Sequence, residues 1–403
     1  MSAPLDVLIA GAGPAGSAVA LRLARAGFRV AAVDRARFPR EKICSEYMSP
    51  EGVRHLAALG VLDSVERSGG HPIQGTMVEA PRGSRLTGLF ALAGTAPFRV
   101  AGLSVTRRIL DHALVEAARG AGATVLEGHS VQGVLLENGV VAGLAVRSED
   151  GAVRELRARL TVGADGLHSV VARAIGGRRF GRLQRYAFVA HAEGVPGLSD
   201  TAEMHVAADG YVGLNPLGGG LANVALVVPK ERAAQARGRP ESFFLEQLER
   251  FPGVRGRVRA GSIVRAVLVT GPFAAWSRQV VTAGALLTGD AADFFDPFTG
   301  EGICAALRGA ELLEATARDA LARSGPLSAA ALAPYARARR RAFLGKWTVE
   351  RAIGYAMLAP ALFDRAVGRM ERRGLAHTLI GVTGDFVPPS AVLNPVFLSQ
   401  VVF

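Results

Sequence analysis

Hydrophobic and polar positions near the start of the chain follow two different periods in turn. Val7-Leu8-Ile9-Ala10 is a short continuous apolar run, which is typical of a buried strand in a parallel sheet. Residues 17–27 then carry small and apolar side chains at helical spacing, and Gly27 ends that segment. Residues 29–33 form a second apolar run. The pattern therefore predicts a strand, a helix and a second strand in one short unit.

The same two periods continue along the chain and then change character. Helical spacing returns over 51–68, after a polar loop at 36–50, and again from Val105 to Gly120. The dipeptide Asn138-Gly139 lies between two strand-like runs and indicates a hairpin. Further strands are predicted over 73–100, 124–127, 131–136, 140–148, 160–163, 185–195, 202–208, 210–214, 222–229, 261–269 and 283–288, and helices to about Ile175 and from 301 onward.

This change of pattern predicts a discontinuous domain. The strands of 181–269 have turn residues between them, which is typical of an antiparallel sheet inserted into the first domain. We therefore expect a nucleotide-binding domain from 1–72, 100–180 and 270–320. The sheet domain is expected from 73–99 and 181–269, and a helical C-terminal cap from 321–403.

Composition excludes several classes of protein. At 403 residues the chain can bury a large core. No apolar run has transmembrane length, and a strand begins within a few residues of the N-terminus, so no signal peptide is expected. Cys44 and Cys304 are too few for a disulfide framework or a zinc site. We expect a cytoplasmic protein that holds no metal.

The formal net charge of +12 comes almost entirely from arginine, in a chain that is also rich in glycine and alanine, which indicates biased genome composition. Basic patches with interleaved aromatic residues are missing, so nucleic-acid binding is not expected. Residues 337–373 carry ten Arg or Lys against three Asp or Glu. That segment would allow a peripheral contact with an anionic membrane surface; a solvated helical face is the alternative. The oligomeric state is left open.

The turn between the first strand and helix carries the first candidate chemistry. Gly11 permits a tight turn, Gly13 lets the backbone approach a pyrophosphate, and Gly16 lets the helix pack closely on the strand. A pyrophosphate there would meet the unpaired N–H groups at the helix N-terminus. Asp34 ends the second strand, where it can accept hydrogen bonds from a ribose diol. Together these residues form the dinucleotide-binding fingerprint.

Two later motifs follow the fingerprint in order, namely Val162–Gly166 and Gly289–Ala292, the second continuing into Pro297–Gly302. With these three motifs the chain resembles the FAD-dependent aromatic hydroxylases and the geranylgeranyl reductase-like flavoproteins, one superfamily with the para-hydroxybenzoate hydroxylase fold. The resemblance covers roughly residues 4–320. It implies an α/β fold: a Rossmann-like FAD-binding domain, an inserted antiparallel β-sheet substrate domain and a helical C-terminal segment. It also implies FAD as cofactor and NAD(P)H as a transient reductant.

The resemblance also implies roles for single residues. Asp34 should hold the ADP ribose, and Arg107 should contact FAD. Asp165 and Gly166 match a motif associated with FAD and with the passing NAD(P)H, and Asp290 should bind the ribityl chain. Pro297 should lie against the isoalloxazine, with Gly300 to Gly302 donating N–H groups to its pyrimidine edge. Further cofactor contacts are expected from Pro14, Ala15, Arg35, Lys42, Cys44, Gly289 and Ile303.

The loop 42–50 resembles the K-x-C-G-E-x-L-S-P loop of the reductase-like branch, with Ser45 where that branch has glycine. In that branch the loop lies beside the flavin, so Cys44 is a candidate for the active site; a buried, inert cysteine is the alternative. Candidate substrate contacts are Tyr47, His191, His205, Tyr211, Asn215 and Phe298. Among the candidate catalytic residues, which are Cys44, His205, Tyr211, Asn215 and Pro297, a histidine would accept a phenol proton. Glu203 and His205 share a face of one strand, which permits a coupled pair.

The cofactor frame alone does not decide the reaction. We favour an NAD(P)H-dependent FAD monooxygenase that uses O₂ and a C4a-hydroperoxyflavin to hydroxylate a hydrophobic phenolic or polyketide-like substrate, because residues 211–220 lack the aromatic stretch common in the reductases. The alternative is a reductase that saturates isoprenoid double bonds. A halogenase is disfavoured because the W-x-W-x-I-P signature is missing. A flavoprotein whose redox state controls membrane binding is the remaining alternative.

Overall fold

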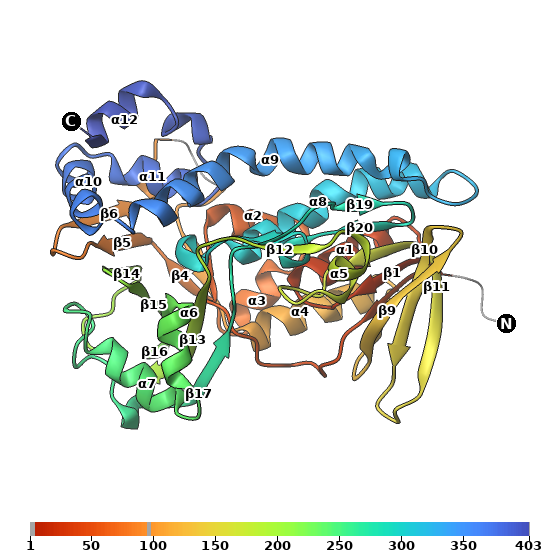
Figure 1. Cartoon of the computed structure of the whole chain (residues 1–403), viewed down its shortest axis with the longest axis horizontal. Coiled ribbons are helices and arrows are strands. Elements are labelled where there is room, and N and C mark those ends of the chain that lie inside the picture. The colour runs from red at the N-terminus through yellow and green to blue at the C-terminus, as the bar shows by residue number, and fades with distance from the viewer. Residues whose placement is uncertain (1–4, 95–97, 403) are drawn as a thin grey trace.

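Two large sheets dominate the computed structural model, which describes residues 5–94 and 98–402 (Figure 1). The first sheet has eight strands, in the order β19-β20-β11-β1-β2-β8 with β10 and β9 added beside β11. Strands β20, β11, β1, β2 and β8 are parallel neighbours. The strands are β1 (Leu5–Ala10), β2 (Val30–Val33), β8 (Thr124–Leu126), β9 (Ser130–Glu137), β10 (Val140–Arg147), β11 (Val153–Gly163), β19 (Val281–Thr282) and β20 (Ala285–Leu287).

The central strands of this sheet are apolar on both faces, so each face must be covered. Helices cover one of the two faces. Val7 and Ile9 of β1 point to one side and belong to the largest buried cluster, together with Leu21 and Leu307 from the covering helices. Leu8 points to the opposite side, against the hairpin of β9 and β10. The helices of this half are α1 (Pro14–Arg25), α2 (Pro50–Ala58), α3 (Leu62–Arg67), α4 (Arg107–Gly120), α5 (Val170–Ile175) and α8 (Gly302–Leu321).

The second sheet has seven strands in the order β17-β13-β16-β15-β14-β5-β6. One face packs on α7 through Phe243 and Phe244, two of the largest fully buried side chains. Its strands are β5 (Gly75–Glu79), β6 (Arg85–Leu89), β13 (Arg185–Glu193), β14 (Thr201–Ala207), β15 (Gly210–Gly218), β16 (Leu221–Pro229) and β17 (Ile263–Thr270), with α6 (Lys230–Ala233) and α7 (Pro240–Leu248) inserted. All its pairs are antiparallel except β14 with β5, which are parallel.

The C-terminal helices close the molecule over both sheets. The long helix α9 (Ala329–Ala356) runs along α8 in Figure 1, and the helices that follow it lie over the β5–β6 edge of the second sheet. Val367 and Ile380 are buried from these helices. The remaining helices are α10 (Pro360–Arg372), α11 (Ala376–Thr383) and α12 (Pro395–Val402), and the small sheets contain β3 (Tyr47–Met48), β4 (His71–Ile73), β7 (Gly102–Ser104), β12 (Arg178–Phe180), β18 (Ala275–Ser277) and β21 (Asp293–Phe294).

The architecture confirms the predicted fold class, with three differences in detail. The helix expected over 51–68 is two helices, because Gly60 has a positive φ of 70° and breaks the helical path. The strands predicted over 73–100 end at Leu89, and residues 95–97 of that range lie outside the described residues. The inserted sheet, predicted to be antiparallel, contains one parallel pair. None of the helices in the described ranges is both long and apolar enough to cross a membrane.

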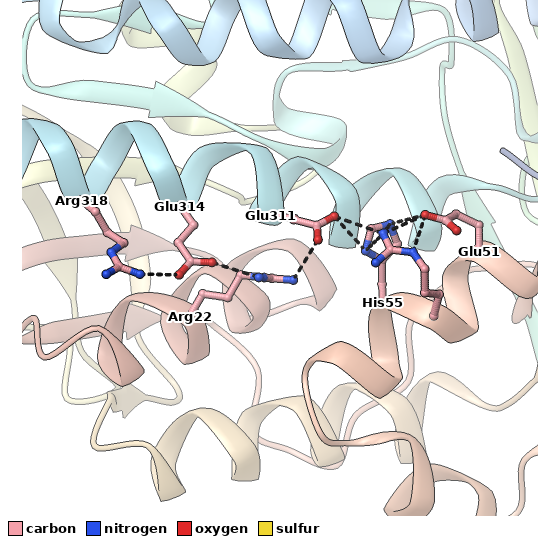
Figure 2. Close-up of polar contacts among 7 residues, drawn as sticks. Arg22, Glu51, His55, Glu311, Glu314 and Arg318 are labelled. Atoms are coloured by element: carbon pink, nitrogen blue, oxygen red, sulfur yellow. Dashed lines mark hydrogen bonds and ion pairs between the residues drawn. The ribbon is translucent and has the colours of Figure 1, made fainter. Parts of the chain in front are cut away.

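A network of charged side chains ties α1, α2 and α8 together (Figure 2). Arg22 on α1 pairs with Glu314 on α8 at 2.9 Å between Nη1 and Oε2. His55 on α2 lies between Glu51 and Glu311, 3.5 Å and 3.4 Å from their carboxylates. Burial, with nearby Arg54 as a second cause, lowers the pKa of His55 to about 3, so its ring is neutral at ordinary pH. The network therefore fixes how α1, which begins at the glycine turn, sits against its neighbours.

Candidate active site

A cavity of about 680 Å³ is lined by residues of both sheets. The first sheet contributes the carboxyl ends of its strands, including Gly11 after β1, Asp34 after β2 and Ala164 after β11. The second sheet contributes its inner face, with Ala187 and Ala225. Ligands of open parallel sheets bind outside the carboxyl ends of the strands. This cavity is therefore the candidate site for both a dinucleotide and a substrate.

The glycine turn lies at one end of this cavity, with the N-terminus of α1 facing it. Gly11 has a φ of 91°, and a Cβ there would lie 2.5 Å from the carbonyl oxygen of Ala164, so no other residue fits. A Cβ on Gly16 would lie 1.8 Å from the carbonyl oxygen of Gly11. Gly16 itself does not line the cavity, whereas Gly11, Gly13, Pro14 and Ala15 do. The turn thus has the close helix packing and open backbone that the sequence predicts.

Asp34 is held rigidly at the end of β2. Its Oδ2 accepts a hydrogen bond of 2.9 Å from the backbone N–H of Ala12, and its Oδ1 accepts one of 2.9 Å from that of Ala36. The carboxylate lines the cavity beside Arg35. Each carboxylate oxygen can accept a further hydrogen bond, so a ribose diol could bind here without disturbing the turn.

Cationic side chains line the cavity on the side of α4. Arg107 at the first turn of α4 makes a bidentate pair with Asp111, at 2.7 Å and 2.8 Å, and Arg40 contacts the same carboxylate at 3.1 Å. Lys42 also lines this side. Asp290 is half-buried in the short 3₁₀ turn Gly289–Ala291; the loss of water around its carboxylate raises its pKa, while Lys42 and Arg107 act in the opposite direction.

The Asp290 carboxylate accepts no hydrogen bond from the described part of the chain, so it is free for a ligand hydroxyl.

Asp165 makes hydrogen bonds within the chain, and the cofactor contact that the resemblance implies for it stays a prediction. Its Oδ2 accepts a hydrogen bond of 2.6 Å from the backbone N–H of Val170, and its Oδ1 accepts the hydroxyl of Ser169. Both oxygens are therefore used to cap the start of α5. Asp165 and Gly166 do line the cavity, with Gly166 at a φ of 78°. Asp165 therefore caps α5 from a position in the cavity wall.

The second glycine-rich stretch forms another wall of the cavity. Pro297 to Thr299 make one 3₁₀ turn, Gly300 has a φ of 71°, and α8 begins at Gly302. A Cβ on Gly300 would lie 2.7 Å from the ring of Tyr47, so this position holds glycine because a ring packs against it. Phe298 packs edge-on against Tyr211 with ring centroids 5.2 Å apart. The predicted cofactor contacts Pro297, Gly300, Gly302 and Ile303 all line the cavity, and so does Phe298, the predicted substrate contact.

Hydrogen bonds hold the loop around Cys44 to the inner face of the second sheet. The amide of Asn223 donates to the carbonyl oxygen of Cys44 at 2.8 Å, and the amide of Asn215 donates to that of Ser45 at 3.0 Å. His191 contacts Glu46 at 2.6 Å between Nε2 and Oε2. Cys44 lines the cavity, and burial raises the pKa of its thiol, so it is a thiol and not a thiolate.

The inner face of the second sheet brings together only some of the predicted substrate contacts. Tyr47 and Tyr211 line the cavity, and the Tyr211 hydroxyl donates to Asp296 at 2.6 Å. His191 lies on the inner face but is bonded to Glu46, and the cavity lining does not include it. Asn215 lines the cavity, but its amide is used by Ser45 and by the hydroxyl of Ser104. His191 and Asn215 therefore hold the loop in position, and their polar groups are already used in doing so.

The structure does not bring His205 to the cavity, and the prediction of a catalytic or substrate contact there is wrong. His205 does form the expected pair with Glu203, at 2.7 Å between Nε2 and Oε2. The pair points to the opposite face of the sheet, where Arg257 contacts Glu203 and a Cβ on Gly253 would lie 2.4 Å from the His205 ring. Side chains alternate between faces along a strand, so residues 203 and 205 both lie on the α7 side.

Helix α9 contributes cavity residues that the sequence analysis missed. Arg339 and Lys346 are buried, whereas the charge pattern of 337–373 predicts a solvated or membrane-facing surface. The helix residues that line the cavity are Arg339, Phe343, Lys346, Trp347 and Glu350. They recur three or four positions apart, which places them on one face of a helix. This spacing, which places charged and aromatic side chains on one helix face, is the feature of the sequence from which their shared location can be predicted.

The comparisons with known proteins agree with this geometry. Residues 4–342 match the family described as FAD binding domain. The chain belongs to this FAD-binding family. FAD is therefore the cofactor, and the activity is that of an FAD-dependent oxidoreductase.

Curated relatives cover most of this flavoprotein's length. Digeranylgeranylglycerophospholipid reductase 2 of Methanothermobacter thermautotrophicus is 30% identical over 383 residues, which is 91% of each chain. Menaquinone reductase of Mycolicibacterium smegmatis is 30% identical over 320 residues, 75% of this chain and 74% of that one. Among solved structures, the myxobacterial chondrochloren halogenase CndH superposes with a TM-score of 0.80 at 24% identity, covering 99% of this chain and 95% of that one, a likeness in fold.

Proposed function

We propose that this flavoprotein reduces carbon–carbon double bonds in a long, apolar, isoprenoid-like substrate. The observation that carries the proposal is the inner face of the second sheet. Small side chains line the cavity on four neighbouring strands, Ala187, Ala202, Gly213 and Ala225, with Val189 and Met204 beside them. The part of the face formed by these side chains leaves room for a flexible hydrocarbon and is apolar. The two relatives of similar length that are named as reductases support the same reaction.

The residues around the cavity fit FAD. The N-terminus of α1 with Gly11 and Gly13 would hold the pyrophosphate, and Asp34 would hold the ADP ribose. The unpaired Asp290 carboxylate would accept from the ribityl hydroxyls. The stretch from Pro297 to Gly302 would lie at the isoalloxazine, where the N-terminus of α8 favours negative charge.

Bound FAD would supply the hydride, after reduction by NAD(P)H, and the second hydrogen added to each double bond would be a proton that comes ultimately from solvent. The chain's own residues orient the substrate and exclude water. Phe298, Tyr211 and Tyr47 place aromatic side chains at the junction between the glycine-rich wall and the inner face of the sheet. The phenol pKa of Tyr47 is raised by burial, so the hydroxyl stays protonated. The apolar lining would hold the double bond in place near the flavin, and the hydrogen-bonded loop around Cys44 would keep its position during turnover.

The experiment is an anaerobic reaction of the NAD(P)H-reduced holoprotein with digeranylgeranylglyceryl phosphate. We expect the flavin to be reoxidised and the lipid to gain two hydrogens for each double bond reduced, as measured by mass spectrometry. The saturated diphytanyl lipid with the same head group is the control and should leave the flavin reduced. If neither this lipid nor menaquinone reoxidises the flavin anaerobically, alkene reduction is excluded for these substrates.

A second candidate is hydroxylation of an apolar phenol with O₂. The observation that favours it is the buried ammonium of Lys346 on α9, because a cation stabilises the phenolate that reacts with electrophilic oxygen. The same reduced holoprotein is mixed with aerated buffer and a long-chain alkylresorcinol. A hydroxylated product, formed only with O₂ present, would replace the reductase proposal by this one.

A further inference from the structure

Helix α9 presents to the cavity a buried ammonium group, that of Lys346, which makes no hydrogen bond within the described residues. Lys346 lies in the second half of the helix, and its side chain is 3% exposed. Its nearest carboxylate oxygen is Oε2 of Glu301, at 3.9 Å. Within residues 5–94 and 98–402, no atom makes a hydrogen bond to the Lys346 Nζ. A buried ammonium has three donors to satisfy, and leaving them unmade is costly.

The other buried cation on the same helix face behaves differently. Arg339 contacts Asp293 at 2.6 Å and stacks over the rings of Phe343 and Trp347, with distances of 5.1 Å and 5.2 Å to their centroids. Its charge is therefore compensated within the protein. The same Oε2 of Glu301 that lies nearest to Lys346 accepts a hydrogen bond of 3.1 Å from the hydroxyl of Ser49. The Glu301 carboxylate is thus shared, and the Lys346 ammonium stands apart from it.

Two carboxyl groups near Lys346, those of Glu301 and Glu350, are not always ionised near neutral pH. Burial raises the pKa of Glu301 to about 7 and that of Glu350 to about 7, even though Lys346 opposes both shifts. Near neutral pH each carboxyl is therefore often protonated. Burial disfavours the charged form of Lys346, but Glu301 and Asp385 outweigh it and raise the pKa of the ammonium. The ionisation of Lys346 and that of Glu301 therefore favour each other.

We propose that the Lys346 ammonium binds a negatively charged or strongly accepting oxygen of the molecule that occupies the cavity. The distance of 3.9 Å to Glu301 supports this, because a dedicated ion pair closes to about 2.7–2.9 Å. The oxygen has two sources: the polar end of the substrate, or the pyrimidine side of the flavin, where negative charge develops on reduction. The first source rests on the proposed function, since it takes the occupant to be an apolar molecule with one oxygen-bearing end.

The test compares the holoprotein with Lys346→Met, which keeps the length of the side chain and removes its charge. The matched control is Lys230→Met, because Lys230 is exposed at the start of α6. Two readouts need no turnover. One is the affinity of geranylgeranyl phosphate and of phytane, an isoprenoid hydrocarbon without oxygen, measured from their perturbation of the flavin spectrum. The other is the midpoint potential of bound FAD.

If the substrate supplies the oxygen, Lys346→Met lowers the affinity for geranylgeranyl phosphate about tenfold or more and leaves the affinity for phytane unchanged. If the flavin supplies it, the midpoint potential becomes more negative in Lys346→Met, because the anionic reduced form loses a nearby cation, and both probes keep their affinity. The proposal is overturned if Lys346→Met matches Lys230→Met in both readouts, in which case Lys346 serves only to neutralise Glu301. Should Lys346→Met fail to fold, the double variant Lys346→Met/Glu301→Gln removes both buried charges together and is measured in its place.

Failure of the proposed function gives a different result. A protein that binds geranylgeranyl phosphate through Lys346 but never reduces it would retain the tenfold effect on binding and show no lipid product. A reductase in which Lys346 is only structural would show lipid product and no selective loss in either readout.

Discussion

His191 on β13 and Glu46 in the loop before β3 are joined by a hydrogen bond of 2.6 Å between Nε2 and Oε2 across 145 positions of sequence. Burial raises the pKa of the Glu46 carboxyl, but the His191 bond and its charge outweigh burial and lower it, so Glu46 is ionised. Glu46 also accepts the backbone N–H of Arg107 at 2.9 Å. One contact therefore couples the second sheet, the loop and the first turn of α4.

Replacing His191 should weaken FAD binding. His191→Leu removes a charge-assisted hydrogen bond of roughly 1.5–3 kcal/mol and leaves the Glu46 carboxylate with fewer donors. We expect the dissociation constant of FAD, measured by fluorescence titration of the apoprotein, to rise about tenfold. His205→Leu is the matched control, since it breaks a similar buried His–Glu bond on the far face and should leave FAD affinity unchanged. Equal FAD affinities for the two variants would contradict the coupling.

Asp290→Asn should raise the stability of the apoprotein and lower its affinity for FAD. The half-buried Asp290 carboxylate has no hydrogen-bond donor in the described chain, and the loss of surrounding water raises its pKa. An amide there removes an unfavourable buried charge but also removes an acceptor for the ribityl hydroxyls. We expect the apoprotein to unfold at a higher denaturant concentration than the wild type, while FAD binds about tenfold more weakly. An apoprotein that is destabilised by the change would show that Asp290 is already paired.

Asp111→Asn should cost far more stability than an exposed carboxylate on the same helix. Asp111 is fully buried and holds both Arg107 and Arg40. Removing one member of a buried ionic cluster costs about 3–5 kcal/mol, because the remaining charges stay buried. Glu116→Gln is the control: Glu116 pairs with Arg119 at the surface and should change the free energy of unfolding by less than about 1 kcal/mol. Urea denaturation of the three proteins gives the comparison, and equal costs would argue against the buried cluster.

His55 should make the stability of the fold depend on acid pH. The ring has a pKa of about 3 in the folded protein and about 6.5 in the unfolded chain. Between those values the unfolded state binds one more proton, so the free energy of unfolding falls as the pH is lowered from 6.5 toward 3. The limiting slope is about 1.4 kcal/mol per pH unit, with no contribution above pH 6.5. Denaturation of wild type and His55→Gln at pH 5 and pH 7 should show the larger drop in the wild type; parallel behaviour would place His55 in contact with water.

The part of the site that the sequence predicts is the part that depends on local chemistry. The glycine turn, Asp34 and the Pro297–Gly302 stretch each lie within a few residues of a strand or helix end, so period and turn preference are enough to place them. The choice of sheet face is not local. The sequence shows that Glu203 and His205 share a face, but the pairing of β14 with β15 and β5 decides that this face is the outer one.

The contribution of α9 could not be predicted for a related reason. Arg339 and Lys346 are basic residues in a basic segment, and the sequence gives no sign that they are buried while Arg340 and Arg341 are exposed. Their burial depends on Asp293 and Glu301, which belong to a different part of the chain and are brought near only when α9 packs along α8. Asp165 illustrates the opposite case, because its motif was recognised while its hydrogen bonds to α5 were not visible in the pattern.

The pairing of distant strands has a consequence for how the protein is made. Thr201 on β14 pairs with Gly75 on β5, and β20 joins the first sheet beside β11 only after the whole inserted sheet has been synthesised. Neither sheet can close while β20 and β14 are still inside the ribosome, and contacts of such long sequence separation form slowly. Until then the nascent chain exposes unpaired strand edges, which are prone to aggregation. The topology therefore delays completion of the cofactor site until β20 and the start of α8 have been synthesised, long after the glycine turn that begins it.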